Sequence, residues 1–331
     1  MFKVTLLSGK TFEVQRGQSI LEAAEDAGNS LPYSCRTGRC SSCKCRIVGP
    51  TTLKFDELGL TDAEKQSGWK LTCARVPTGD VKLDINDLGD IDLPKAKVVP
   101  AKIDELTYLT SDILKLRLRL PPTAQFRFIP GQYINLIGKN GLQRSYSLAS
   151  DCNGQVLEMH VRRVPNGTMS EYLFENAKVD DLLRISGPHG TFILRPLAEN
   201  DLIFVATGTG IGPVKSMIEQ IESMPADQLP RSIKILWGMR REEEIYWSPS
   251  NKLDLVDFIP VLSQAADGWD GERGYVQDVL CRSNVITPQT YIYSCGSEAM
   301  INATKSKALS AGVTEENFYS DSFVASNLET Y

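Results

Sequence analysis

The sequence has only two histidines among 331 residues, and their spacing does not suggest a histidine metal site. It has no run of about 18 apolar residues that could span a bilayer. Its N-terminus alternates like a strand and lacks the apolar core of a secretion signal. A formal net charge of −5 argues against a nucleic-acid-binding surface. These absences predict a soluble, cytoplasmic protein without a membrane or nucleic-acid partner.

The composition also lacks anything fibrous, repetitive or disulfide-rich. A 42% hydrophobic and 23% charged content is that of an ordinary globular protein. The length is too great for one core and predicts two or three domains. Eight cysteines are too few for a disulfide scaffold, and several are clustered, so metal ligands are the better interpretation.

Four of those cysteines have an informative spacing. Cys35, Cys40 and Cys43 follow the pattern C-x4-C-x2-C, and Cys73 follows after 29 further residues. This is the plant-type spacing of a [2Fe–2S] cluster, which needs four thiolates on two irons. A zinc site is the alternative, but zinc sites usually use paired C-x2-C knuckles and only one such pair is present.

The residues around the cysteines predict a small α+β domain. A hairpin is expected at residues 4–14, short helices after the capping boxes that begin at Ser19 and Thr61, and strands at 45–48 and 81–85. Residues 1–92 therefore resemble a plant-type ferredoxin domain, which implies a β-grasp fold.

The middle segment, residues 96–197, is expected to be an antiparallel barrel. Residues 113–120 alternate between apolar and basic, Asn140-Gly141 is a strong hairpin signal between strands at 132–138 and 142–150, and another strand is predicted at 156–164. Two patterns lie in this segment. One is Arg144, Tyr146 and Ser147 on a strand, and the other is a glycine turn before a helix, formed by Gly167, Thr168, Met169 and Ser170.

A helix N-terminus suits a pyrophosphate, and an arginine can add a bidentate phosphate contact. Each pattern is weak alone, but in this order they resemble the R-x-Y-S and G-x-x-S motifs of the ferredoxin–NADP reductase superfamily. The resemblance implies FAD rather than FMN, with Ser147 near flavin N5, Tyr146 on the flavin ring and Arg144 on phosphate. His160 and Arg162 are further candidates to line the flavin, and His160 is equally compatible with an ordinary strand position.

The last segment, residues 198–331, is expected to be a parallel α/β domain. A buried-type strand at 202–207 runs into a glycine turn and a helix at 214–222, and further strands are predicted at 232–237, 258–262 and 291–294. This arrangement predicts a dinucleotide site at Thr207, Gly208, Thr209, Gly210, Ile211, Gly212 and Pro213.

By the same resemblance, Cys295 and Gly296 lie beside the nicotinamide, although Ser297 replaces the usual proline. A plain buried thiol is the alternative for Cys295. Asp321 and Phe323 match the terminal segment of the family, where an acidic residue assists proton transfer and an aromatic residue shields the flavin. With Ser147 and Cys295 they are the candidate catalytic residues.

Residues 238–244 are expected to determine whether NADH or NADPH binds. Arg240 could bind a 2′-phosphate, but three consecutive glutamates follow and would repel one, so NADH is favoured over NADPH.

These features predict an iron–sulfur flavoprotein reductase in which electrons pass from NADH to FAD, to the [2Fe–2S] cluster and then to a protein partner. Two groups of such reductases are similar. One serves the pyridoxamine-phosphate, iron–sulfur dehydrase of CDP-3,6-dideoxyhexose biosynthesis (the CDP-6-deoxy-Δ3,4-glucoseen reductases), and the other serves oxygenase components. The stretches 213–217, 237–239, 294–301 and 318–323 favour the first group. A non-enzymatic redox carrier or sensor is the alternative of another class. A monomer is expected.

Overall fold

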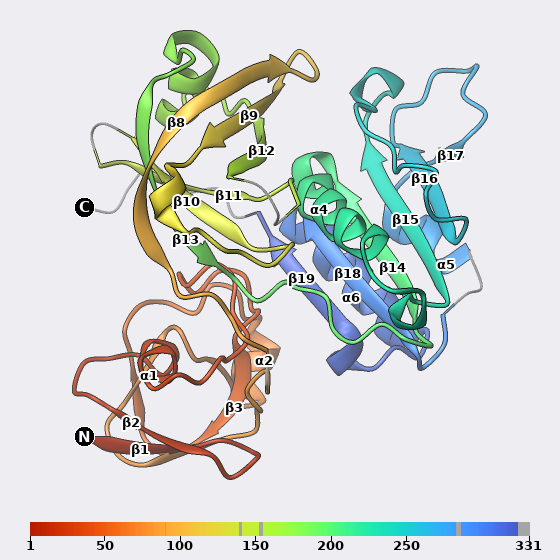
Figure 1. Cartoon of the computed structure of the whole chain (residues 1–331). Coiled ribbons are helices and arrows are strands. Elements are labelled where there is room, and N and C mark those ends of the chain that lie inside the picture. Colours follow the sequence, from red (N-terminus) through yellow and green to blue (C-terminus); the bar gives the residue numbers. More distant parts are fainter. Residues whose placement is uncertain (90, 139–140, 152–154, 283–285, 324–331) are drawn as a thin grey trace. The chain divides into compact units, whose positions relative to one another are not determined.

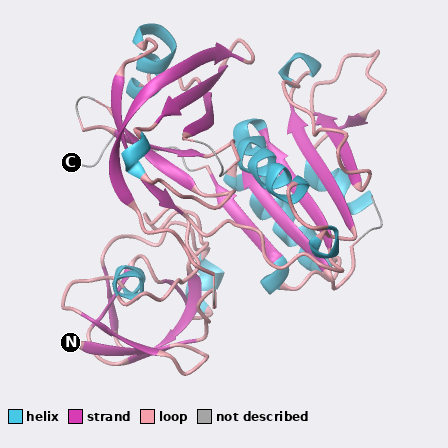
Figure 2. Ribbon diagram, viewed as in Figure 1, coloured by secondary structure: helices cyan, strands magenta, loops and turns pink. Residues whose placement is uncertain are grey.

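The computed structural model describes residues 1–331 except 90, 139–140, 152–154, 283–285 and 324–331. Asn140 of the predicted hairpin turn therefore lies outside the described residues. The chain divides into two compact units, residues 1–93 and 94–331. Figure 2 distinguishes their helices and strands.

The first unit is a small mixed sheet with a helix across it. The strand order is β2-β1-β7-β3-β5, with β1 and β7 parallel and the outer pairs antiparallel. Apolar residues of α1 share one core with those of the sheet, which confirms the predicted fold class. The elements are β1 (Phe2–Thr5), β2 (Thr11–Val14), α1 (Ile20–Asp26), β3 (Lys44–Val48), β4 (Thr51–Leu53), α2 (Asp62–Gln66), β5 (Trp69–Leu71), β6 (Arg75–Pro77) and β7 (Val81–Leu83).

Both predicted capping boxes are formed. The Ser19 hydroxyl accepts from the Glu22 N–H while the Glu22 carboxylate accepts from the Ser19 N–H. Thr61 and Glu64 repeat the arrangement at α2. Each box satisfies two N–H groups that a helix start leaves without intrahelical partners, so these short helices begin where the sequence predicts.

The second unit begins with a six-stranded antiparallel sheet, ordered β11-β10-β13-β8-β9-β12. The Ala149 N–H donates to the Glu158 carbonyl at 2.8 Å and brings the two ends of the sheet together, so the sheet is a nearly closed barrel. Its elements are β8 (Lys97–Tyr108), β9 (Ile113–Arg119), β10 (Tyr133–Ile137), β11 (Gln143–Ser147), β12 (Val156–Arg162), α3 (Thr168–Glu171), a π-helical turn (Tyr172–Asn176) and β13 (Leu182–His189).

A parallel sheet ordered β17-β16-β15-β14-β18-β19 completes the unit (Figure 1). Alternate residues of β14 face opposite layers: Leu202 and Phe204 pack against α4, whereas Ile203 and Val205 pack against α5 and α6. The result is a three-layer α/β arrangement, as expected. Its elements are β14 (Asp201–Thr207), α4 (Ile211–Glu222), β15 (Ser232–Met239), β16 (Val256–Leu262), β17 (Glu272–Arg273), α5 (Val276–Arg282), β18 (Thr290–Gly296), α6 (Glu298–Ser310) and β19 (Phe318–Ser322).

The order of the parallel strands places a ligand site. From β14 the chain continues to β15 on one side, and β18 pairs on the other side. Ligands of such sheets bind outside the carboxyl ends of the strands, at the point where the strand order reverses. That point is formed by the ends of β14, β15 and β18.

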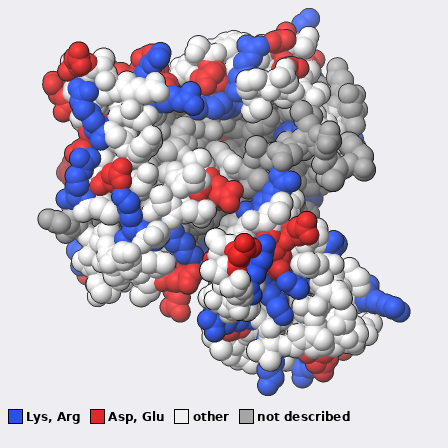
Figure 3. Space-filling view, turned by 180° about the vertical axis from the view of Figure 1, so that it is seen from behind, with Lys and Arg blue, Asp and Glu red and all other residues white. Residues whose placement is uncertain are grey.

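None of the helices in the described part of the chain has the length and apolar content needed to cross a bilayer. Among the side chains that Figure 3 colours, basic and acidic groups are interspersed.

We predict that Gly131→Ala lowers the free energy of unfolding of the second unit by about 3 kcal/mol. Gly131 has φ +97°, and a Cβ there would lie 1.9 Å from the Phe192 carbonyl oxygen. Gly141→Ala is the matched control, because Gly141 also has a positive φ (+74°) but open space around it. Urea unfolding followed by tryptophan fluorescence measures both variants, and equal losses would contradict the packing argument.

Candidate functional site

The four predicted ligand cysteines form two pairs in the first unit. The Cys43 and Cys73 sulfurs lie 3.3 Å apart, and the Cys35 N–H donates to the Cys40 sulfur at 3.3 Å. No three His, Cys, Asp or Glu side chains of the described residues converge on a site for a single ion. Two pairs of thiols fit a cluster whose two irons each take two protein thiolates, and fit a one-ion zinc site poorly.

The loop lowers the pKa of one ligand thiol, Cys35, and so favours its thiolate, the form that binds metal. Hydrogen bonding to a neighbouring thiol and burial raise the pKa of Cys40 and of Cys43. Hydrogen bonding from the Cys40 thiol, opposed by burial and assisted by Thr37 and the Arg39 N–H, lowers the pKa of Cys35 to about 5. The Thr37 N–H lies 3.4 Å from the Cys35 sulfur. Backbone donors therefore surround the sulfurs, as the sequence predicts for this loop.

A second loop, residues 55–59, supports the cysteine loop. The Gly59 N–H donates to the Gly38 carbonyl at 2.7 Å, and an added Cβ at Gly38 would lie 2.4 Å from a backbone oxygen of the second loop. The buried Glu57 carboxylate accepts from the Leu71 N–H at 2.7 Å and from Arg75 Nε at 2.9 Å. Because Leu71 and Arg75 flank the fourth ligand cysteine, Glu57 ties that ligand to the second loop, which the Gly59–Gly38 hydrogen bond joins to the loop that carries the other three.

The predicted flavin residues occupy one strand of the barrel. Arg144, Tyr146 and Ser147 are all on β11 and are each partly exposed. Burial raises the pKa of Tyr146, whose ring packs against the barrel core. A cation, an aromatic ring and a hydroxyl along one strand combine apolar surface with polar groups, as sites for flat, phosphate-bearing ligands do, so these residues fit a flavin nucleotide.

The predicted glycine turn is present at residues 167–170, with a difference in how its side chains are used. Gly167 is the N-cap of α3, as expected. Met169 belongs to the barrel core, and the Ser170 hydroxyl accepts from the Val164 N–H at 2.8 Å. The loop is thus braced by its own side chains, and its backbone N–H groups and Thr168 are the groups with which it can bind a pyrophosphate.

A cavity of about 500 Å³ lies at the carboxyl ends of the parallel strands. Glycines at the ends of β14, β15 and β18 line it, together with Arg240 and Phe323. Of the predicted dinucleotide turn, Thr207, Gly208 and Thr209 line the cavity. The other four residues, Gly210, Ile211, Gly212 and Pro213, lie behind it, and all four are buried.

Two glycines bring the walls of the cavity together. An added Cβ at Gly210 would lie 2.3 Å from the Cys295 carbonyl oxygen, and one at Gly296 would lie 2.3 Å from Thr207 Oγ1. The Ser297 N–H donates to the same Thr207 hydroxyl at 3.3 Å. These contacts hold the first glycine turn against the end of β18, which leaves room for a dinucleotide between side-chain-free backbones.

The four candidate catalytic residues come from distant parts of the sequence and meet in two adjacent places. The Ser147 hydroxyl donates to the buried Asp321 carboxylate at 3.4 Å. Cys295 lies opposite Asp321 in the strand register and is fully buried, and burial raises its pKa. Phe323 lines the cavity and its N–H donates to the Gly296 carbonyl at 2.8 Å.

The two remaining predicted residues face the nicotinamide half of the unit. Arg162 lines the cavity and lies 3.5 Å from both Asp112 and Glu244. His160 is only 3% exposed and lies between Glu158 and Tyr246, where it makes polar contacts with both.

Sequence reasoning did not name several residues that line the cavity. They are Ser263, Gly274, Tyr275, Val276, Gln277, Ala299 and Met300. A usable signal existed, because all of them follow or end strands of one parallel sheet, whose carboxyl ends meet at one edge. Glu57 and Gly59 carry no comparable signal.

With this geometry described, comparison with known proteins becomes informative. Three family models match consecutive parts of the chain: a 2Fe-2S iron-sulfur cluster binding domain at residues 5–78, an oxidoreductase FAD-binding domain at 100–193 and an oxidoreductase NAD-binding domain at 204–306. A reductase from Yersinia pestis, named CDP-6-deoxy-L-threo-D-glycero-4-hexulose-3-dehydrase reductase, is 36% identical over 96% of this chain and 97% of its own. The chain belongs to the family of iron–sulfur flavoprotein reductases.

Other members are similar over their full length. Protein RfbI of Salmonella typhimurium is 37% identical over 96% of this chain and 94% of its own, and terephthalate 1,2-dioxygenase reductase component 2 of Comamonas is 30% identical over 94% of each. The crystal structure of the Amycolatopsis cytochrome P450 reductase GcoB covers 98% of this chain and 99% of its own, with a TM-score of 0.75 and 26% identity.

This iron–sulfur flavoprotein reductase is therefore an NAD(P)H-dependent oxidoreductase. Its three matched domains account for a [2Fe–2S] cluster, FAD and a nicotinamide coenzyme. Members of the family act as electron-transfer components, so the alternative of a non-enzymatic carrier or sensor is set aside.

We predict that Cys43→Ser abolishes the [2Fe–2S] cluster and Cys45→Ser leaves it in place. Both thiols are buried, but Cys43 pairs with Cys73 at 3.3 Å whereas Cys45 packs in the core of the first unit. Visible absorbance, iron content and the low-temperature EPR signal after reduction measure the cluster. Retention of a normal signal in Cys43→Ser, or its loss in Cys45→Ser, would contradict the assignment.

Proposed function

We propose that this reductase uses NADH and passes electrons to the pyridoxamine-phosphate, iron–sulfur dehydrase of CDP-3,6-dideoxyhexose biosynthesis, acting as a monomer in the cytoplasm. The supporting observation is the identity of 36% with the dehydrase reductases of Yersinia pestis and Yersinia pseudotuberculosis, against 28–30% with the reductase components of dioxygenase systems from Pseudomonas and Comamonas. All of these matches span more than nine-tenths of the chain, so the difference does not reflect a missing domain.

Three modules would divide the work: residues 1–92 for the cluster, 96–197 for FAD and 198–331 for the nicotinamide. When bound, the flavin converts the two-electron chemistry of nicotinamide into the single electrons that an iron–sulfur cluster accepts. The four paired cysteines hold the cluster.

The chain's own residues would prepare the flavin site. Arg144 and the backbone of the 167–170 turn bind phosphate. Tyr146 and Phe323 cover apolar ring surface and exclude water. Ser147 and Asp321 form a hydrogen-bonded pair that can hold a proton at the reacting edge.

Cys295 would contribute shape rather than reactivity. Its pKa is raised by complete burial and, to a smaller extent, by the Asp321 carboxylate. The thiol therefore stays neutral, and a compact neutral group beside the cavity permits the nicotinamide ring to approach closely.

The partner assignment is tested with purified candidates. We expect NADH-driven reduction of the iron–sulfur dehydrase, followed spectroscopically, to be at least about tenfold faster than reduction of a dioxygenase component at equal concentration, because electron transfer requires complementary docking surfaces. Ferricyanide serves as an acceptor that needs no docking and controls for enzyme quality. Faster reduction of the oxygenase component would transfer the assignment to the second group.

The coenzyme assignment rests on the charges at the cavity. Arg240 and Glu244 both line it, whereas Glu243 is exposed and lies 3.9 Å from Arg241. We expect a higher kcat/KM for NADH than for NADPH. Glu244→Gln should raise kcat/KM for NADPH roughly fivefold, since removing one like charge near a phosphate is worth about 1 kcal/mol.

Glu243→Gln is the matched control and should leave both values unchanged, because that carboxylate does not line the cavity. A wild-type preference for NADPH would refute the coenzyme assignment without affecting the partner assignment.

A further inference from the structure

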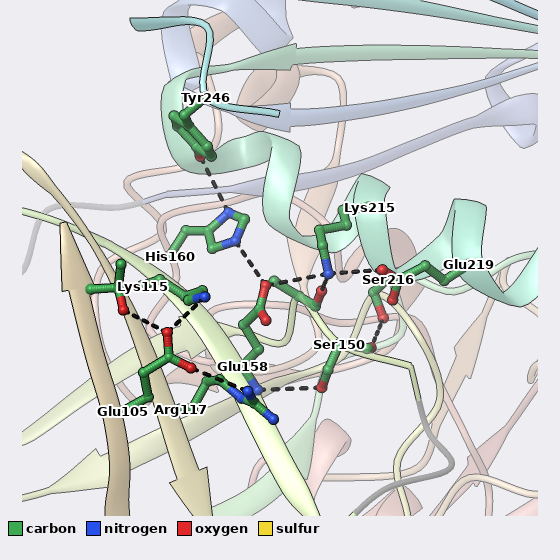
Figure 4. Close-up of polar contacts among 12 residues, drawn as sticks. Glu105, Lys115, Arg117, Ser150, Glu158, His160, Lys215, Ser216, Glu219 and Tyr246 are labelled. Carbon is green, nitrogen blue, oxygen red and sulfur yellow. Dashed lines mark hydrogen bonds and ion pairs between the residues drawn. The ribbon is translucent and has the colours of Figure 1, made fainter. Parts of the chain in front are cut away.

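A partly buried lysine connects the flavin barrel to the nicotinamide domain. Lys215, in the second turn of α4, points toward the barrel strand β12 (Figure 4). Its ammonium donates to the Ala149 carbonyl at 2.7 Å and lies 3.3 Å from Glu158 and 2.8 Å from Glu219. Three acceptors match the three N–H donors of an ammonium, and two of them belong to the barrel.

The neighbouring serine makes the second link. The Ser216 hydroxyl, which is fully buried, donates to the Ser150 carbonyl at 2.6 Å. Helix α4 therefore binds two consecutive carbonyls, those of Ala149 and Ser150. These carbonyls follow β11 directly, two and three residues after Ser147, so the helix is fixed to the strand that carries the flavin motif.

The Glu158 carboxylate is also connected to the glycine turn, through a chain of three side chains. Glu158 contacts His160 Nε2 at 3.1 Å, and His160 Nδ1 contacts the Tyr246 hydroxyl at 3.2 Å. The Tyr246 ring packs edge-on against Trp237 with centroids 5.0 Å apart, and the Trp237 indole N–H donates to the Gly208 carbonyl at 2.9 Å. The turn at Gly208 and helix α4 are thus both anchored to Glu158.

Because these side chains are largely shielded from water, breaking one of their contacts costs free energy. The side chains of Lys215 and Glu158 are each 16% exposed, so a charge left without its partner would be strongly penalised. Although burial by itself raises the pKa of Glu158, His160 and Lys215 together lower it below its usual value and keep the carboxylate ionised. A fully satisfied network of this kind favours one relative position of the two domains over others.

Hydride transfer depends on that position. Reacting atoms must lie about 3–3.5 Å apart, and a misplacement of 1 Å can reduce the rate roughly 100-fold. We infer that Lys215 is a positioning residue: with Ser216 and Glu158 it sets the distance between the flavin strand and the nicotinamide turn. This inference rests on the proposed function only for the hydride step and is independent of the partner.

The experiment compares Lys215→Met, Lys215→Arg and Ser216→Ala in the holoenzyme. Rapid mixing with the nicotinamide that wild type prefers gives the limiting rate of flavin bleaching and the apparent Kd separately. For Lys215→Met we expect the limiting rate to fall roughly 10- to 100-fold with Kd changed less than about threefold. Lys215→Arg should recover most of the rate, and Ser216→Ala should show the same pattern at smaller size.

A second readout does not depend on activity. Hydrogen exchange should quicken in residues 145–150 and 208–222 of Lys215→Met, with residues 1–93 unchanged. Lys252→Met is the matched control: Lys252 is largely exposed and pairs at 3.3 Å with Glu222 at the C-terminal end of the same helix, not with the barrel, so the limiting rate and the exchange of residues 145–150 should stay at wild-type values.

Four results would overturn the inference. They are a normal limiting rate in Lys215→Met, an increase in Kd alone, a loss that Lys215→Arg does not restore, and an equal loss in Lys252→Met. If Lys215→Met does not fold, Ser216→Ala decides, and a wild-type rate and exchange pattern in that variant would refute the positioning role. A wrong partner or coenzyme assignment leaves every comparison intact, because each uses wild-type protein as its reference.

Discussion

The close contact between the end of β18 and the turn after β14 is the constraint on which the second unit depends. Gly210 and Gly296 face backbone and hydroxyl oxygens at distances that no side chain would permit. Strand β19 pairs with β18 at the edge of the sheet and lies alongside the barrel. As a result Asp321 meets Ser147 and the backbone of Phe323 binds that of Gly296. The glycine-lined cavity and the Ser147–Asp321 hydrogen bond therefore both lie at the carboxyl ends of β18 and β19.

The first unit must hold its four ligand cysteines together although they come from two segments of the chain. Three ligand cysteines lie in one loop, but the fourth follows a strand about 30 residues later, so a cluster site requires two segments to be held in register. The buried Glu57 carboxylate does this by bonding on both sides of Cys73. The Glu57 side chain tolerates such burial because Arg75 and a backbone N–H satisfy its oxygens.

Local chemistry was readable from the sequence, and contacts between distant segments were not. The cysteine spacing, the capping boxes at Ser19 and Thr61 and the turn at Gly208 are each dictated by neighbouring residues, and all are present. Strand β8 went unnamed, since Pro100 interrupts a pattern that only pairing with β9 and β13 stabilises. The Ser170 hydroxyl matched a binding motif but serves the fold of its own loop, a distinction that no spacing encodes.

His160 shows most clearly where sequence reasoning stops. Its alternation with Arg162 on one strand suggested either a flavin-lining side chain or an ordinary strand position, and the structure adds polar contacts with Glu158 and Tyr246 that neither interpretation foresaw. Those partners are 2 and 86 residues away, and the second belongs to the other domain. The barrel and the parallel-sheet domain of the second unit must each fold and still pack against one another in one position. Buried polar contacts suit this need better than apolar ones, because they are directional and tolerate little displacement.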